Sequence, residues 1–501
     1  MVQLWVVAAP SIAAPVRAIA DSWAATHPSA GGRCVTVAVD IINSASEFSR
    51  LASSASGDST IWIPDSTLWA ARLPAGTVHV DPPIATSPLV LVAPPNRTVP
   101  AASWSDLLTG KLPATIPDPA VSTDGLLGLL GLRAAVGSGP TANAQLVGVM
   151  IALSHAKLPS ASVGFAALAS APASAPIFAA SEQEVISANR ARHTVFARAI
   201  YPQGGTPSLD FPFVRLVGPD ADPAVTAATA AFETQLRTAA AQARLADAGL
   251  RDPAGHAVAG PADGVQPADL PPSAEPTAAQ AVETLRMWGA ASQDSRLLAV
   301  IDVSGSMGDI TPNGQTKIQI VAAAAATGIG FFPSTSELGL WVFSTNQTPT
   351  TDWAQLVSLG PLGAKVGNVT RRAALLAADQ TMPDRVHGNT ALYDTALAAF
   401  QEVHNTFDPT KVNSVVLMTD GRNVNPGGLT LDQLISTLRA QSDPARPVPI
   451  ITIGIGSDVD VAALQAISAV TGGKTYIVRN PADIRGVFLD AILQRECRPN
   501  C

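Results

Sequence analysis

Five apolar runs of strand length recur along the C-terminal part of the chain, with helical segments between them. The runs are residues 297–303, 337–343, 413–419, 448–455 and 474–478, and the helical segments are residues 315–330, 391–406, 430–441 and 459–471. Strands that are buried on both faces appear in a sequence as nearly continuous apolar runs. The alternation therefore predicts a doubly wound α/β fold with a mostly parallel sheet, whose ligands bind beyond the carboxyl ends of the strands.

Oxygen-bearing side chains gather where these runs end. Asp302, Ser304 and Ser306 stand at alternate positions after the first run, so they share one face of an extended segment. Thr390 and Asp420 stand at later strand ends or in the adjacent loops. Carboxylate and hydroxyl oxygens are ligands that suit Mg²⁺. The pattern indicates a metal site, and the alternative is that these residues only cap helices and tighten turns.

Residues 297–495 resemble the von Willebrand factor A family at these positions. The family's Asp-x-Ser-x-Ser signature is matched by Asp302, Ser304 and Ser306, its threonine by Thr390 and its second aspartate by Asp420. The resemblance implies a Rossmann-like fold with a metal-ion-dependent adhesion site, which holds Mg²⁺ or alternatively Ca²⁺ or Mn²⁺. It also implies a protein partner whose Asp or Glu carboxylate completes the coordination of the metal.

Upstream of residue 253, short apolar runs alternate with amphipathic stretches, which is typical of α/β architecture. Strands are predicted at residues 2–9, 34–41, 60–63, 88–93 and 213–217, and helices at residues 11–26, 44–55, 124–136, 141–155, 181–192 and 222–247. The region resembles bacterial type 2 periplasmic solute-binding proteins at residues 6–13, 62–69, 87–92, 104–108, 116–119 and 201–206. The resemblance implies two α/β lobes with a ligand cleft between them, joined by crossings near residues 84–93 and 200–213.

The resemblance also places a set of polar residues in this cleft. The candidates are Ser11, Asp65, Ser122, Thr123 and Thr206. Ser11, and Ser122 with Thr123, stand at predicted helix starts, where backbone N–H groups attract anions. A small-molecule ligand is therefore one expectation, and ordinary helix capping without a ligand is the alternative.

Composition divides the chain into segments. Residues 253–276 are rich in Pro, Gly, Ala and Asp and show no apolar periodicity, which indicates a linker. The predicted order is a solute-binding-like domain (1–252), this linker (253–276), a lead-in helix (277–296), an A-type domain (297–495) and a cysteine-containing tail (496–501).

The cysteines bear on the compartment. Cys497 and Cys501 are close enough in sequence to form a small disulfide loop, whereas a zinc site would need more ligands than the neighbourhood supplies. A disulfide would indicate an oxidising environment. Cys34 stands in an apolar run and is expected to be a buried, inert thiol.

Charge and hydropathy limit the partners. The net charge of −8 gives no reason to expect binding to nucleic acid. No apolar stretch reaches the roughly 18 residues that a membrane-spanning helix needs. If the protein is exported to the cell surface or envelope, we therefore expect its signal or anchor to lie outside this sequence.

No pairing of a nucleophile with a base, and no catalytic motif, stands out, so the sequence predicts no enzyme. The leading hypothesis is an extracytoplasmic binding protein that holds a protein partner through the metal site. One alternative is the substrate-recognition component of a transport system. Another is a scaffold on which a metalloenzyme is assembled.

Overall fold

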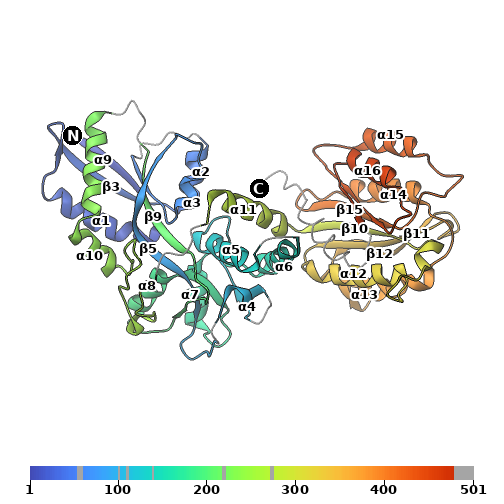
Figure 1. Cartoon of the computed structure of the whole chain (residues 1–501), viewed down its shortest axis with the longest axis horizontal. Coiled ribbons are helices and arrows are strands. Elements are labelled where there is room, and N and C mark those ends of the chain that lie inside the picture. Colours follow the sequence, from blue (N-terminus) through green and yellow to red (C-terminus); the bar gives the residue numbers. More distant parts are fainter. Residues whose placement is uncertain are drawn as a thin grey trace. The chain divides into compact units, whose positions relative to one another are not determined.

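The computed structural model describes residues 1–53, 60–99, 102–108, 112–137, 140–216, 222–270 and 276–478. The chain forms two compact units, Met1–Trp288 and Gly289–Cys501. Each unit has its own β-sheet with helices packed against it, so the predicted α/β class is confirmed for both (Figure 1).

In the first unit, the described residues form a sheet of nine strands in the order β2-β3-β1-β4-β9-β5-β7-β6, with β8 paired to β5. The strands are β1 (Val2–Ala8), β2 (Ser29–Ala30), β3 (Arg33–Ile41), β4 (Ile61–Ile63), β5 (His79–Ala93), β6 (Ala114–Thr115), β7 (Ile177–Ser181), β8 (Arg198–Ile200) and β9 (Ser208–Arg215). The long strand β5 pairs with β9, and its later part also pairs with β7 and β8. Strands β5 and β9 therefore connect two lobes, and they overlap the predicted crossings (Figure 1).

The predicted helices of the first unit lie close to observed ones, whereas the short helices α3, α4 and α7 were not predicted. They are α1 (Pro10–Ala24), α2 (Ser44–Ala52), α3 (Thr67–Ala70), α4 (Trp104–Leu108), α5 (Thr123–Val136), α6 (Pro140–Ala156), α7 (Ala161–Ser170), α8 (Glu182–Arg192), α9 (Pro223–Leu236), α10 (Ala239–Asp247), α11 (Ala278–Ser292) and the 3₁₀ turn η1 (Pro261–Asp263). The single helix predicted over residues 222–247 is two helices. Thr238 separates them, because its side chain accepts a hydrogen bond from Ala241 N and so caps α10.

The described part of the predicted linker, residues 253–270, packs on the first unit instead of running free. Arg251 and Glu182 form an ion pair with side chains only 2% and 1% exposed. The guanidinium of Arg251 also donates to the carbonyl oxygens of Gly255 and Ala268, at 2.8 and 2.7 Å. A buried arginine needs these acceptors, and a segment without regular structure has free carbonyl groups to supply them. The Pro/Gly-rich composition therefore marks irregular backbone in this segment, not a flexible tether.

A six-stranded sheet in the order β12-β11-β10-β15-β16-β17 forms the centre of the second unit in the described residues. Its strands are β10 (Ser295–Asp302), β11 (Glu337–Phe343), β12 (Trp353–Pro361), β15 (Val412–Thr419), β16 (Ile450–Ile455) and β17 (Thr475–Val478), and a separate hairpin joins β13 (Lys365–Val366) to β14 (Val369–Thr370). All neighbours in the six-stranded sheet are parallel except β11 and β12. The five predicted runs are the five parallel strands.

Helices cover both faces of this sheet, as the doubly wound prediction requires. They are α12 (Lys317–Phe331), α13 (Arg371–Asp379), α14 (Leu392–Asn405), α15 (Leu431–Gln441) and α16 (Val461–Val470), with the 3₁₀ turns η2 (Gly305–Gly308) and η3 (Met382–Arg385). Figure 1 shows α12 and α13 below the sheet and α14, α15 and α16 above it. Buried side chains such as Val300, Phe343 and Phe400 join the upper helices to the strands in one core cluster.

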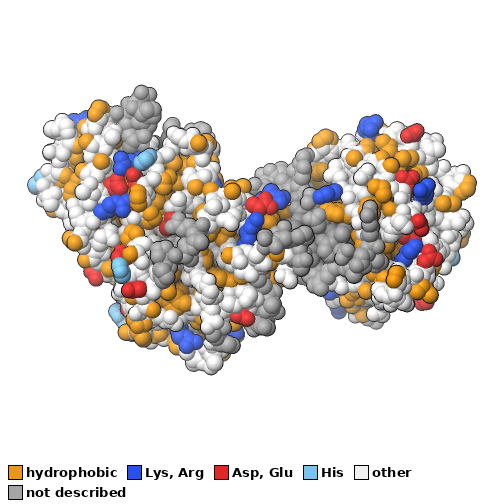
Figure 2. Space-filling model, in the orientation of Figure 1, with side chains coloured by type: hydrophobic (Ala, Val, Ile, Leu, Met, Phe, Trp, Pro, Cys, Tyr) orange, Lys and Arg blue, Asp and Glu red, His pale blue; other side chains and the backbone are white. Residues whose placement is uncertain are grey.

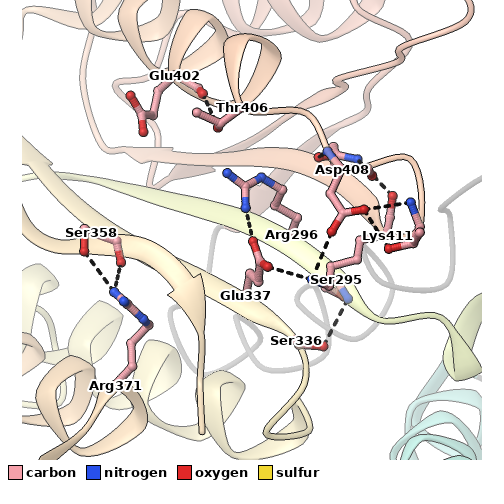
Figure 3. A network of polar contacts seen from close by, with 12 residues as sticks. Ser295, Arg296, Ser336, Glu337, Ser358, Arg371, Glu402, Thr406, Asp408 and Lys411 are labelled. Carbon is pink, nitrogen blue, oxygen red and sulfur yellow. Dashed lines mark hydrogen bonds and ion pairs between the residues drawn. The ribbon is translucent and has the colours of Figure 1, made fainter. Parts of the chain in front are cut away.

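A network of ion pairs lies at the amino ends of the neighbouring strands β10, β11 and β15 (Figure 3). Glu337, at the start of β11, forms ion pairs with Arg296 of β10 and with Lys411, whose Nζ lies 2.6 Å from Glu337 Oε1. Lys411 also lies 3.0 Å from Asp408. Each acidic group here has a basic partner, so this edge of the sheet is electrostatically satisfied by the chain itself.

On the face drawn in Figure 2, Lys and Arg side chains are scattered among Asp and Glu and form no continuous basic area. No helix in the described ranges is long and apolar enough to span a bilayer.

Cys34 is exposed, which corrects the expectation of a buried thiol, because its side chain is on the outward face of β3. Cys497, Cys501 and the disulfide predicted between them lie outside the described residues.

Candidate metal centre

The carboxylate of Asp302 is held rigidly at the carboxyl end of β10. Its Oδ1 accepts a hydrogen bond from Ser304 N at 2.7 Å, and its Oδ2 accepts one from Thr419 Oγ1 at 2.5 Å. Asp302 and Thr419 are both fully buried. One donor from the loop after β10 and one from the neighbouring strand β15 therefore fix the orientation of this carboxylate before any ligand arrives.

The other four predicted residues join Asp302 in one connected group. Ser306 Oγ donates to Asp420 Oδ1 at 2.8 Å and lies 3.4 Å from Ser304 Oγ. Thr390 Oγ1 donates to Ser304 Oγ at 3.2 Å. The structure thus brings together all five side chains that the sequence singled out, although they come from three separate segments.

Two glycines shape the loops around this group. Gly388 has φ = +74°, and a Cβ at that position would meet Thr345 Oγ1 at 2.8 Å, so a side chain is excluded there. Its backbone carbonyl accepts a hydrogen bond from Gly305 N at 3.0 Å, which ties the Thr390 loop to the loop after β10. A Cβ on Gly421 would stand 3.1 Å from Thr390 Oγ1. Small residues therefore allow Thr390 to approach the serine loop closely.

The electrostatics of the group suit a cation. The pKa of Asp302 is raised to about 6, mainly by burial and in smaller part by the charge of Asp420, while hydrogen bonds from Ser304 and Thr419 oppose the increase. Two carboxylates and three hydroxyls are hard oxygen donors of the kind that Mg²⁺ prefers. These five residues fit a divalent cation, because a positive charge at this position would offset the cost of burying the carboxylate of Asp302.

Lys317 is a member of the site that the sequence did not reveal. Its Nζ lies 2.7 Å from Asp420 Oδ2 and 3.2 Å from Asp309 Oδ2, and its side chain is only 17% exposed. Burial alone would lower the pKa of Lys317. The ion pairs with Asp420 and Asp309 outweigh this effect and raise the pKa. The ammonium group neutralises one of the two carboxylates that a metal would use. No sequence pattern distinguishes this lysine, which begins α12, from one on a solvated helix face.

Lys317→Met should therefore raise the affinity of the second unit for Mg²⁺ by roughly tenfold, the equivalent of about 1.4 kcal/mol. The substitution removes a charge that competes for Asp420 and keeps the aliphatic stem. Calorimetric titration of the whole chain with MgCl₂ would measure the change, and Lys365→Met, at an exposed position in β13, is the matched control. A fall in affinity would mean that Lys317 instead holds Asp420 in place for the metal.

The structure places the predicted cleft residues of the first unit in different surroundings. Thr123 Oγ1 donates to Asp65 Oδ1 at 2.6 Å, and Ser122 caps α5, so these three lie together. Thr206 donates to the carbonyl oxygen of Leu89 at 2.6 Å and is used to anchor the loop before β9. Ser11 lies in the first turn of α1, and among the described residues no hydrogen bond joins its side chain to the other four. Ser122 caps the start of α5.

Two acidic residues near Asp65 were missed. Asp124 stands in the first turn of α5 and Glu184 in the first turn of α8. Glu184 accepts hydrogen bonds from the backbone N–H and the hydroxyl of Ser181 in a capping box, at 3.0 and 3.1 Å. The sequence Ser181-x-x-Glu184 indicates a helix start, and nothing in it places that start beside Asp65. The predicted attraction for anions is therefore opposed by carboxylates that already occupy these helix N-termini.

Comparison with known families agrees with this geometry. Residues 4–251 match the family described as bacterial extracellular solute-binding protein, and residues 297–489 match the von Willebrand factor type A domain. The chain therefore consists of a solute-binding-protein domain followed by a von Willebrand factor type A domain. Domains of the second kind usually bind a divalent metal. Together the two domains support a binding or adhesion role outside the cytoplasm.

Among whole-chain relatives, uncharacterized proteins from two strains of Mycobacterium tuberculosis are 27% identical over 520 residues, which covers 94% of this chain and 73% of theirs. Among solved structures, a von Willebrand factor type A protein from Catenulispora acidiphila has a TM-score of 0.31 at 20% identity and covers 40% of this chain and 42% of its own. The sulfate-binding protein of M. tuberculosis has a TM-score of 0.39 at 20% identity and covers 53% of this chain and 89% of its own.

Proposed function

We propose that this chain is a non-catalytic protein of the cell surface or envelope that binds a protein partner through a divalent metal, Mg²⁺ in the first place. The metal would be held by Asp302, Ser304, Ser306, Thr390 and Asp420, and an Asp or Glu of the partner would complete its coordination. The single observation that carries the proposal is the unbroken set of hydrogen bonds at one edge of the sheet, which joins four of these side chains to one another and joins Asp302 to them through the backbone N–H of Ser304.

The residues of this chain have separate tasks in such a contact. A bound divalent cation supplies a positive charge with a coordination position that an outside carboxylate can fill. Asp302, fixed by Ser304 N and Thr419 Oγ1, keeps its orientation without reorganising when the partner arrives. Ser306 is half-buried whereas Asp302 is fully buried, so an approaching group meets the site from the side of Ser306.

A peptide library tests the proposal without knowledge of the natural partner. Peptides displayed on phage would be selected on the immobilised whole chain in MgCl₂ and eluted with EDTA. We expect the eluted peptides to carry an Asp or Glu that is essential for binding, so that its change to Asn or Gln removes binding. The same peptides should not bind Asp420→Asn and should bind the exposed control Asp458→Asn normally. Peptides that bind equally well in EDTA, or a selection without any EDTA-eluted acidic peptide, would contradict the proposal.

A further inference from the structure

A cavity lies in the second unit between the sheet and the two helices below it, α12 and α13 (Figure 1). Its apolar walls come from β10, β11 and one face of each helix, and they include Leu297, Leu338, Leu340, Ile329, Phe332 and Leu375. Three further lining residues, Ala299, Ala325 and Gly328, are small. Protein interiors are usually filled, and short side chains on facing elements explain why this space is left open.

Asp379 is the charged residue of this otherwise apolar lining, and it stands one turn after Leu375 on α13. It is only 3% exposed, and its buried Oδ1 accepts no hydrogen bond from any described residue. None of the ion pairs found in the described part of the chain includes this carboxylate, in contrast to Glu337 in the network at the amino ends of the strands. A buried carboxylate oxygen without a donor is costly, so it marks a place where the N–H groups of a ligand would be stabilised.

The two basic residues of α13 are used elsewhere. Arg371 and Arg372 begin the helix, and the seven residues from Arg372 to Asp379 correspond to a rise of roughly 10 Å. Arg372 donates to the carbonyl oxygens of Ile329 and Phe332, and Arg371 donates to that of Ser358. Asp379 is also the last residue of α13, where the helix dipole adds partial negative charge. Its position therefore favours a cation that this helix does not itself supply.

We propose that this cavity binds a short aliphatic primary amine, whose ammonium group donates to Asp379 and whose alkyl chain lies against the apolar walls. The empty space is about 390 Å³ with the part open to solvent included, and small-molecule pockets begin at roughly 300 Å³, so only a short molecule fits. The ammonium group would form a charge-assisted hydrogen bond in a desolvated place, and the alkyl chain would be removed from water.

Other classes of ligand fit this lining less well. An anion would meet an uncompensated carboxylate. A divalent metal ion needs several oxygen ligands, and the lining offers the carboxylate of one residue among apolar side chains. A wholly apolar molecule would fill the space and leave Asp379 without a donor.

The inference goes beyond the metal-dependent function and does not rest on it. None of the five residues of the metal site lines the cavity. Leu297 and Ala299 of β10 line it, whereas Leu298 and Val300, between and beyond them, belong to the core cluster under the helices on the opposite face. Binding measured in EDTA therefore reports on the cavity alone.

Titration of the whole chain with n-butylamine, in EDTA and at pH 8, tests this inference. Burial raises the pKa of Asp379 to about 7, so most of its carboxylate is charged at this pH. We expect n-butylamine to bind saturably and to slow hydrogen exchange in α12 and α13. The controls n-butanol and butyrate, which have the same chain with a neutral or a negative head, should bind more than about tenfold more weakly. Nα-acetyl-lysine N-methylamide distinguishes the two sources of such an amine, since it binds as well only if the cavity admits a lysine side chain of a peptide.

Asp379→Asn should weaken the binding of n-butylamine by at least about tenfold, because it removes the charge and keeps the size of the side chain. Ala325→Leu should weaken binding as well, because it fills the cavity from α12 and leaves the carboxylate in place. Asp384→Asn, at an exposed position in η3, should bind as the wild type does. Hydrogen exchange at β10 and β15 would show that each variant is folded. Failure of n-butylamine to bind, equal binding of n-butanol, or unchanged affinity in Asp379→Asn would each overturn the inference.

Discussion

Asp302→Asn is expected to abolish the stabilisation of the second unit by Mg²⁺ while leaving that unit folded. At a Mg²⁺ concentration of about 100 times the dissociation constant, the wild-type unit should gain about 2.7 kcal/mol in free energy of unfolding, and the variant none. The amide can retain both local contacts, since its oxygen still accepts from Ser304 N and its NH₂ group can donate to Thr419 Oγ1. The substitution therefore removes the charge that the metal requires without removing the side chain.

Hydrogen exchange of the whole chain, followed at peptides from β10 and β15, would measure this effect in the second unit alone. Peptides from the first unit should be unaffected by Mg²⁺ in both proteins. Asp458→Asn, an exposed carboxylate beyond β16 at the same edge of the sheet, should respond to Mg²⁺ as the wild type does. If Asp302→Asn and the wild type gained equal protection, Asp302 would have no part in a metal site.

Much of the second unit could be predicted because its strands are apolar on both faces. Four of the five parallel strands are almost wholly buried, so their composition alone indicates their place in the sheet. The fifth, β17, is mostly half-buried but still appears as an apolar run. The sixth strand, β12, was missed because it is an antiparallel edge strand whose residues are mostly half-exposed or exposed. Exposed edge positions lack the continuous apolar pattern that identifies a buried strand. Helix α13, which follows β12 in the sequence, was also not predicted.

The two candidate sites differ in how far the sequence could define them. Asp302, Ser304 and Ser306 are two residues apart, so local geometry alone puts them on one face. Asp65 and Thr123 are 58 residues apart in the sequence, and only the packing of the two lobes brings them within hydrogen-bond distance. Lys317 and Arg251 were missed for the same reason, since an ion pair between distant residues leaves no local pattern. Residues 253–270 were misassigned because composition indicates irregular backbone and does not say what the backbone contacts.

Asp379, the last residue of α13, is a buried carboxylate of the second unit that lies away from the metal site. It is only 3% exposed, and its Oδ1 accepts no hydrogen bond from any described residue. It lines a small apolar cavity with Leu297, Leu338 and Leu375. Burial raises its pKa from 3.8 to about 7. Because the folded state disfavours the charged form, the stability that Asp379 contributes is complete below about pH 4 and is lost as the pH rises through 7.

Asp379→Asn should therefore stabilise the second unit at pH 8 and have little effect at pH 4. A shift of about three pKa units corresponds to a gain on the order of 4 kcal/mol at the higher pH, where each unit is worth about 1.4 kcal/mol. Hydrogen exchange at β10 and β15, in EDTA and over a series of pH values, would give the difference between variant and wild type. Asp384→Asn, at an exposed position in η3, should show no such pH-dependent difference. A variant that was less stable than the wild type at pH 8 would show that Asp379 has a cationic partner and contributes to the fold as a charged group.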